Sequence, residues 1–189
     1  MRHFSFMPAL TLSGRKNKGL RGLAGKPFHP PLTDVPVGAY TVALVLDVLS
    51  FVLHDGHPQL ATEMFRGGTW ALLTGYAVSL LAALTGWADW HRSSEPGTQA
   101  RRTINAHAIL MLTTTALILL DILLRTQAYG DDAYTPLVVL ALTVVAYVLL
   151  TLGSTIGGTL VFDYGFNVET AGDHPVWHKN ESDVKHGDK

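Results

Sequence analysis

The 189-residue sequence contains no cysteine, and only 15% of its residues are charged. Ordinary soluble domains carry about 25% charged residues, so this chain is unusually poor in charge. The absence of cysteine excludes disulfide bonds, zinc fingers, cysteine-ligated iron–sulfur clusters and covalent attachment of c-type haem. Any metal or haem ligand must therefore be a histidine or a carboxylate.

The sequence also lacks the short motifs that identify common enzymes and nucleotide-binding proteins. It has no G-x-G-x-x-G, Walker A, H-E-x-x-H or G-x-S-x-G pattern. The basic N-terminal segment lacks interleaved aromatic residues, so we expect no nucleic-acid partner. A short apolar patch precedes this basic cluster, which is the wrong order for a cleavable signal peptide. Whether the protein is an enzyme is left open by these absences.

Apolar residues are gathered into four long stretches, at residues 37–53, 69–90, 106–128 and 136–162. At about 1.5 Å per residue the last three exceed the roughly 30 Å of bilayer hydrocarbon, and the first reaches it if its helix begins near Leu32. We therefore predict an all-α integral membrane four-helix bundle over residues 32–163, with helices at about 32–53, 68–90, 105–128 and 136–162. A basic segment, residues 1–31, precedes it and a polar tail, residues 164–189, follows.

Lysine and arginine are concentrated on one side of the predicted topology. Of the fourteen such residues, only Arg66 and Arg125 fall in or beside the two loops on the opposite side. Positively charged segments stay in the cytoplasm, so we predict that both termini are cytoplasmic.

An internal repeat appears when the chain is shifted by 74 residues. The shift places ALVLDVL (43–49) over LILLDIL (117–123), with Asp47 on Asp121. It also places WADW (87–90) over VFDY (161–164), with Asp89 on Asp163. Apolar segments match one another easily, so the aspartates carry the argument. The pattern indicates two tandem helical hairpins related by an axis along the membrane normal.

Asp47 and Asp121 are predicted to lie inside the membrane at similar depth. An ionisable group there costs about 2.5 to 3.5 kcal/mol on insertion scales and usually needs a partner. Asp121 has Arg125 at i+4, which favours a local ion pair. Asp47 has no basic residue at i+3 or i+4, so its partner must come from elsewhere. The pair is either a polar contact that holds helices together or a proton or ion site.

Asp89 and Asp163 fall at predicted helix C-termini, where the helix dipole disfavours a negative charge. Arg101 and Arg102 are close to Asp89 in sequence, which favours a salt bridge to that loop. In the alternative interpretation these carboxylates orient histidines, as ligating imidazoles require through their second nitrogen.

Two histidines are expected at the cytoplasmic side. His107 opens the third predicted helix, and His29 lies in KPFHPPLTDVPVG (26–38), where the prolines predict a shaped lid. Asp34 is expected to accept a hydrogen bond at the start of the first helix. We predict one site containing His29, His107 and Asp89, roofed by the proline-rich stretch, with Asp34 near its edge.

Four segments resemble the bacterial membrane family catalogued as domain of unknown function 2231: HPPLTDVPVGAYTVALVLDVL, LAALTGWADW, ARRTINAHA and GGTLVFDYG. The resemblance covers roughly residues 22–170, with the segments in the expected order. It implies four transmembrane helices in a bacterial inner membrane and says little about activity. Members of such families are sometimes joined to Rieske-type domains, which implies redox partners; this chain has neither that domain nor its cysteines.

Two classes of function remain open. In the first, the protein is a redox membrane subunit that holds a b-type haem or metal between His29 and His107, or through His107 alone, and meets a redox partner protein. In the second it is a structural or assembly protein without a cofactor, which associates with a partner or with copies of itself. A proton-coupled carrier built around Asp47 and Asp121 is a third interpretation.

Overall fold

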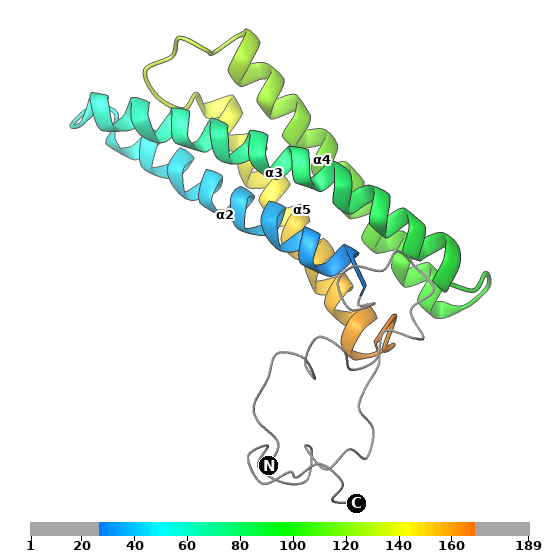
Figure 1. Ribbon diagram of the computed structural model, residues 1–189. Coiled ribbons are helices and arrows are strands. Elements are labelled where there is room, and N and C mark those ends of the chain that lie inside the picture. The colour runs from blue at the N-terminus through cyan, green and yellow to red at the C-terminus, as the bar shows by residue number, and fades with distance from the viewer. Residues whose placement is uncertain (1–26, 169–189) are drawn as a thin grey trace, which may run out of the picture.

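The computed structural model describes residues 27–168, and this part of the chain is a bundle of four helices (Figure 1). The helices are α2 (His29–Leu53), α3 (Pro58–Ser93), α4 (Gln99–Gln127) and α5 (Leu137–Phe162). Each is long and apolar enough to cross a membrane. The prediction of an all-α four-helix membrane bundle is confirmed. Most of the predicted basic segment and polar tail lies outside the described residues.

Consecutive helices run antiparallel and pack as two hairpins, α2 with α3 and α4 with α5 (Figure 1). The hairpins join through further contacts of α2 with α5 and of α3 with α4. One end of the bundle holds the start of α2 and the end of α5, and we call it the terminal end. The opposite end carries loops 54–57 and 128–136, and we call it the two-loop end. Two hairpins are what the repeat predicts, and the duplication itself stays a prediction.

The proline-rich stretch is part of a helix, so the predicted lid is wrong. Helix α2 already begins at His29, with Pro30 and Pro31 in its first turn and Pro36 inside it. Proline suits a first turn because its fixed φ is helical and its missing N–H is not needed there. Asp34 does not cap the helix, because it lies exposed beyond the first turn while Phe28 holds the N-cap position without a side-chain hydrogen bond.

The middle of the bundle is a small apolar core. It contains Tyr40, Leu72, Ile118 and Leu150, one from each helix. Large apolar side chains also cover the outside of the bundle. Leu84, for example, is 63% exposed, and Ile109 is 64% exposed. An outward apolar surface of this kind is suited to lipid and not to water, in agreement with membrane-spanning helices.

A buried arginine network and a pair of histidines

Arg125 is buried near the two-loop end, where it pairs with the carboxylate one turn earlier on the same helix. Its Nε donates to Asp121 Oδ1 at 2.9 Å, and both side chains have no exposed surface. The i,i+4 spacing of these residues on α4 brings them to one face. The local ion pair expected from the sequence is therefore present, and it lies in the interior of the bundle.

Arg125 is also the partner of Asp47, which the sequence could not identify. The guanidinium crosses from α4 to α2, where Nη1 donates to Asp47 Oδ1 at 2.9 Å and Nη2 donates to Asp47 Oδ2. Thr135, in the loop before α5, donates its hydroxyl to Asp47 Oδ1 at 3.2 Å. Paired parallel hydrogen bonds of this kind are strong and fix the geometry of both side chains. One arginine thus serves two aspartates on different helices.

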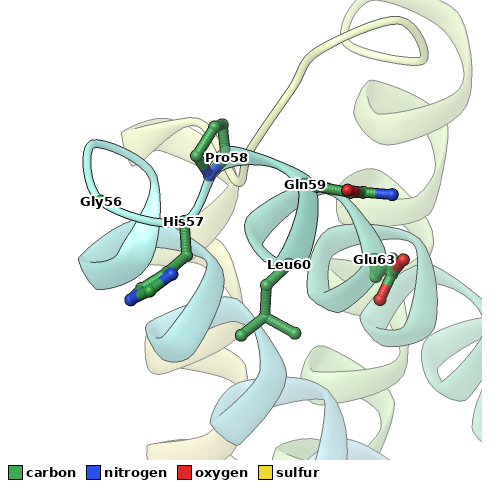
Figure 2. Close-up of a pocket in the computed structure, with 6 residues that line it drawn as sticks. All are labelled: Gly56, His57, Pro58, Gln59, Leu60 and Glu63. Atoms are coloured by element: carbon green, nitrogen blue, oxygen red, sulfur yellow. The ribbon is translucent and has the colours of Figure 1, made fainter.

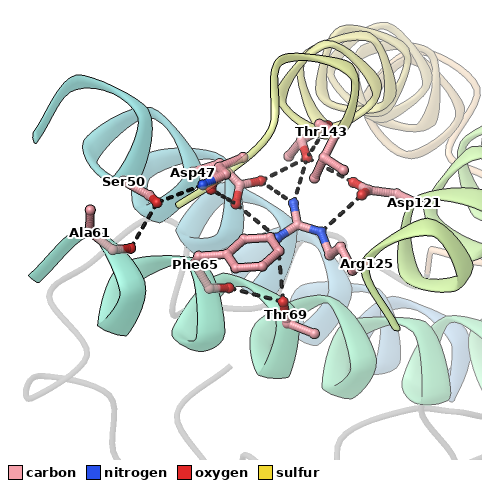
Figure 3. A network of polar contacts seen from close by, with 10 residues as sticks. Asp47, Ser50, Ala61, Phe65, Thr69, Asp121, Arg125 and Thr143 are labelled. Carbon is pink, nitrogen blue, oxygen red and sulfur yellow. Dashed lines mark hydrogen bonds and ion pairs between the residues drawn. The ribbon is translucent and has the colours of Figure 1, made fainter. Parts of the chain in front are cut away.

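Hydroxyl groups from the other helices complete the network (Figure 3). Thr143 on α5 accepts from Arg125 Nη2 at 3.1 Å, and Thr69 on α3 lies 3.5 Å from Nη1. The Thr143 oxygen also lies 2.8 Å from both Asp47 Oδ2 and Asp121 Oδ2. The network therefore connects all four helices.

Small and aromatic residues close the network from the α3 side. A Cβ atom at Gly68 would lie 3.0 Å from Asp47 Oδ1, so glycine permits the close approach of α3. The Phe65 ring lies 5.3 Å from the Arg125 guanidinium carbon. A cation over an aromatic face is stabilised by the ring's charge distribution, more so when water is excluded.

Sequence reasoning missed the threonines of this network. Thr69 and Thr143 are 74 residues apart, so the shift that superposes Asp47 on Asp121 also superposes these two residues. This second match under the same shift is the sequence feature that could have identified the two threonines. A threonine in an apolar helix is common by itself, because its hydroxyl can bond the carbonyl one turn earlier. The Thr143 oxygen lies 3.1 Å from the Val139 carbonyl oxygen, which is longer than its 2.8 Å contacts with the two aspartates.

His29 lies at the terminal end and is held against α3. Its Nδ1 is 2.9 Å from the Ala82 carbonyl oxygen and 3.3 Å from Thr85 Oγ1. A Cβ atom at Gly86 would lie only 2.8 Å from His29 Cε1, so the ring occupies the space that a side chain at residue 86 would need. The first residue of α2 is therefore positioned by three residues of the neighbouring helix.

His107 is held in the same way by the other hairpin. Its Nδ1 lies 2.8 Å from the Gly153 carbonyl oxygen on α5, and a Cβ atom at Gly157 would lie 3.1 Å from its Cε1. A carbonyl oxygen only accepts, so Nδ1 of each neutral imidazole carries the hydrogen. Nε2 of both His29 and His107 then keeps its lone pair, which is the form that binds metals.

The two histidines are at the same end of the bundle, at the start of α2 and in the first part of α4. The donor set fits haem iron, because ligating histidines almost always donate the second ring N–H to a carbonyl, carboxylate or water. Their assignment as ligands stays a prediction.

The other predicted site residues are spread over the terminal end. Asp89 is buried near the end of α3, whereas Asp163, its counterpart in the repeat, is exposed at the C-cap of α5. The Arg101 guanidinium lies 3.6 Å from the centre of the Trp90 ring and donates to the Trp90 carbonyl at 2.8 Å. Arg102 is exposed and donates to the Gln99 side chain at 2.9 Å. Arg101 thus joins the start of α4 to the end of α3, whereas the Arg102 contact lies within α4.

A surface hollow of about 570 Å³ lies at the two-loop end, around the start of α3 (Figure 2). His57 and Glu63 point apart there, with Leu60 between them (Figure 2). The residues that line the hollow do not converge on one point, so it does not compete with the histidine pair as a candidate site.

A family model described as a predicted membrane protein, DUF2231, matches residues 25–170 of this chain. No curated protein and no solved structure matches it. The matched range includes both the arginine network and the histidine pair.

Proposed function

We propose that this chain, which belongs to the DUF2231 family of predicted membrane proteins, is a redox-associated membrane subunit that holds a b-type haem iron between His29 and His107. The observation that supports this proposal is the hydrogen-bonding pattern that the two imidazoles share. Each donates Nδ1–H to a carbonyl of its own hairpin, at 2.9 Å and 2.8 Å. Each therefore presents an unprotonated Nε2 from a ring whose position is fixed.

The chain's own residues have defined roles in this proposal. Haem, when bound, would supply one-electron exchange between ferric and ferrous iron. The carbonyls of Ala82 and Gly153 set the tautomer and direction of the rings, and Gly86 and Gly157 leave room for them. Loss of a hydrogen-bond partner of a ligating group typically lowers metal affinity about 10- to 100-fold.

The location of the site defines the kind of partner. The histidines lie at the terminal end, which the lysine and arginine distribution assigns to the cytoplasmic side of a bacterial inner membrane. A redox partner protein would therefore approach from the cytoplasm. The exposed rings of Trp87 and His91, stacked with their centres 5.8 Å apart near the end of α3, lie on the side of approach.

The absorption spectrum of the detergent-purified protein tests the haem proposal. We expect a b-type Soret band that shifts on reduction with dithionite, and its loss in His29→Ala and in His107→Ala. His54→Ala is the matched control, because His54 lies at the two-loop end, stacked on Tyr134 with ring centres 4.1 Å apart. Featureless visible absorbance in protein produced with haem supplied, or a Soret band unchanged in both site variants, would reject the proposal.

A structural or assembly role is the second candidate, and the arginine network supports it. Buried ion pairs are weak evidence for stability, but they can fix one arrangement of helices against others. In this case the protein would associate with a partner or with copies of itself and need no cofactor. The structural role predicts that Arg125 variants lose their assembly or their fold, whereas His29 and His107 variants keep both.

A further inference from the structure

The Arg125 network contains more acceptors than its hydrogens can satisfy. Thr143 has one hydroxyl hydrogen, yet its oxygen lies 2.8 Å from a carboxylate oxygen of Asp47 and 2.8 Å from one of Asp121. A hydroxyl can donate only once. One of these two short contacts must therefore receive its hydrogen from a carboxyl group, or two oxygens would face each other without a hydrogen between them.

The surroundings of the two carboxyl groups differ, and the difference identifies which one holds the hydrogen. Asp47 receives both Nη groups of Arg125 and the Thr135 hydroxyl in addition to Thr143. Asp121 receives Arg125 Nε on Oδ1, and its Oδ2 meets Thr143. A carboxylate with several donors is stabilised in its charged form. Asp47 is therefore the ionised group, and Asp121 Oδ2 is the atom that can carry a hydrogen.

Charge balance leads to the same assignment. Asp47, Asp121 and Arg125 have almost no exposed surface, and with both acids ionised they would carry a net negative charge inside the bundle. The side chains that face them from α3 and α5, Phe65, Thr69 and Thr143, carry no charge. One added proton makes the set neutral, which removes the cost of an uncompensated buried charge.

We propose that the Arg125 network is a buried proton-binding site, in which Asp121 Oδ2 carries one proton and donates it to Thr143 Oγ1, while Thr143 donates its own hydrogen to ionised Asp47. This chain of hydrogen bonds runs from α4 through α5 to α2. It is independent of the haem proposal, which concerns the opposite end of the bundle. The ligand is a proton, and the acid, the relay and the base are Asp121, Thr143 and Asp47.

Infrared spectroscopy of the purified full-length protein at neutral pH tests for this proton. We expect the carbonyl stretching band of a protonated carboxylic acid, lost in Asp121→Asn and retained in Asp89→Asn, which alters a buried carboxyl group at the terminal end. Thr143→Val keeps the shape of the side chain but removes the acceptor, so it should shift the band. Absence of the band from the wild-type protein, its persistence in Asp121→Asn, or an unchanged frequency in Thr143→Val would each overturn the proposal.

The position of the proton is tested by comparing two isosteric variants in an SDS unfolding titration. In Asp121→Asn the new amide can accept from Arg125 Nε and donate to Thr143, as the protonated acid does, so the unfolding midpoint should stay near the wild-type value. In Asp47→Asn the new NH₂ group must face the donors of Arg125, so the midpoint should fall clearly. Equal losses in the two variants would overturn the assignment to Asp121.

Discussion

Replacing Arg125 with methionine removes the cation that joins the two buried aspartates. The methionine keeps much of the side-chain length but donates no hydrogen bond. Asp121 loses the hydrogen bond from Nε, Asp47 loses those from both Nη groups, and Thr143 loses that from Nη2. The substitution therefore tests whether the network holds the helices in their observed arrangement.

The expected loss follows from the contacts of the guanidinium. Three hydrogen bonds to carboxyl groups, at about 1.5–3 kcal/mol each, would suggest a loss of about 4.5–9 kcal/mol. The actual loss should be smaller, because Asp47 can take up a proton once Arg125 is gone and the buried charge then disappears. Breaking a buried pair by removing one partner typically costs about 3–5 kcal/mol, and we expect a decrease in unfolding free energy of this size for Arg125→Met.

The unfolding free energy is measured by SDS titration of the protein in detergent micelles, followed by circular dichroism. Arg66→Met is the matched control, because Arg66 lies exposed on α3 near the same end and should change stability by no more than about 0.5 kcal/mol. Arg125→Lys should fall between the two, since one ammonium cannot reproduce the fork of contacts. If Arg125→Met proves no more destabilising than Arg66→Met, the network does not hold the bundle together.

Three further predictions concern glycine packing and topology. Gly86→Ala should push His29 from its carbonyl partner, since the new Cβ would lie 2.8 Å from the ring, and should cost about 1–3 kcal/mol, measured by the same titration. Gly38→Ala, also helical but with nothing within 4 Å of the new Cβ, should instead gain about 0.5–1 kcal/mol, and a loss there would contradict the packing argument. A cysteine at Gly56 should react with an impermeant thiol reagent in whole cells and one at Pro96 should not; the reverse pattern would invert the predicted orientation.

The helices were predictable from the sequence because the bilayer imposes a minimum apolar length. Two helix starts differ from the prediction: α4 begins at Gln99 instead of residue 105, and α3 extends back to Pro58 from the predicted residue 68. The larger difference is that of α3. Glu63 and Arg66 made this segment look like a loop, yet both are exposed on helical turns near the two-loop end. Polar composition alone does not separate a loop from a helix that continues beyond the hydrocarbon.

The candidate sites were predictable only where a local rule applied. The Asp121–Arg125 pair follows from i,i+4 spacing, but the partner of Asp47 lies 78 residues away, and no local pattern connects the two. The expected lid and the cap at Asp34 were wrong for the opposite reason. A local rule about proline was applied as if it excluded helix, whereas Pro30 and Pro31 occupy the first turn, where proline is favoured.

The two ends of the bundle use their polar groups in different ways. At the two-loop end the hydrogen-bonding capacity of Arg125 is directed inward, onto Asp47, Asp121 and hydroxyl groups. At the terminal end His29 and His107 each use one ring nitrogen on a carbonyl and keep a lone pair on the other. Polar contacts directed inward favour one arrangement of helices, whereas a lone pair held in a fixed position favours a ligand. Arg125 thus joins α2 to α4 at one end of the bundle, and the same two helices carry the two histidines at the other end, where each ring is held by its neighbour in the hairpin.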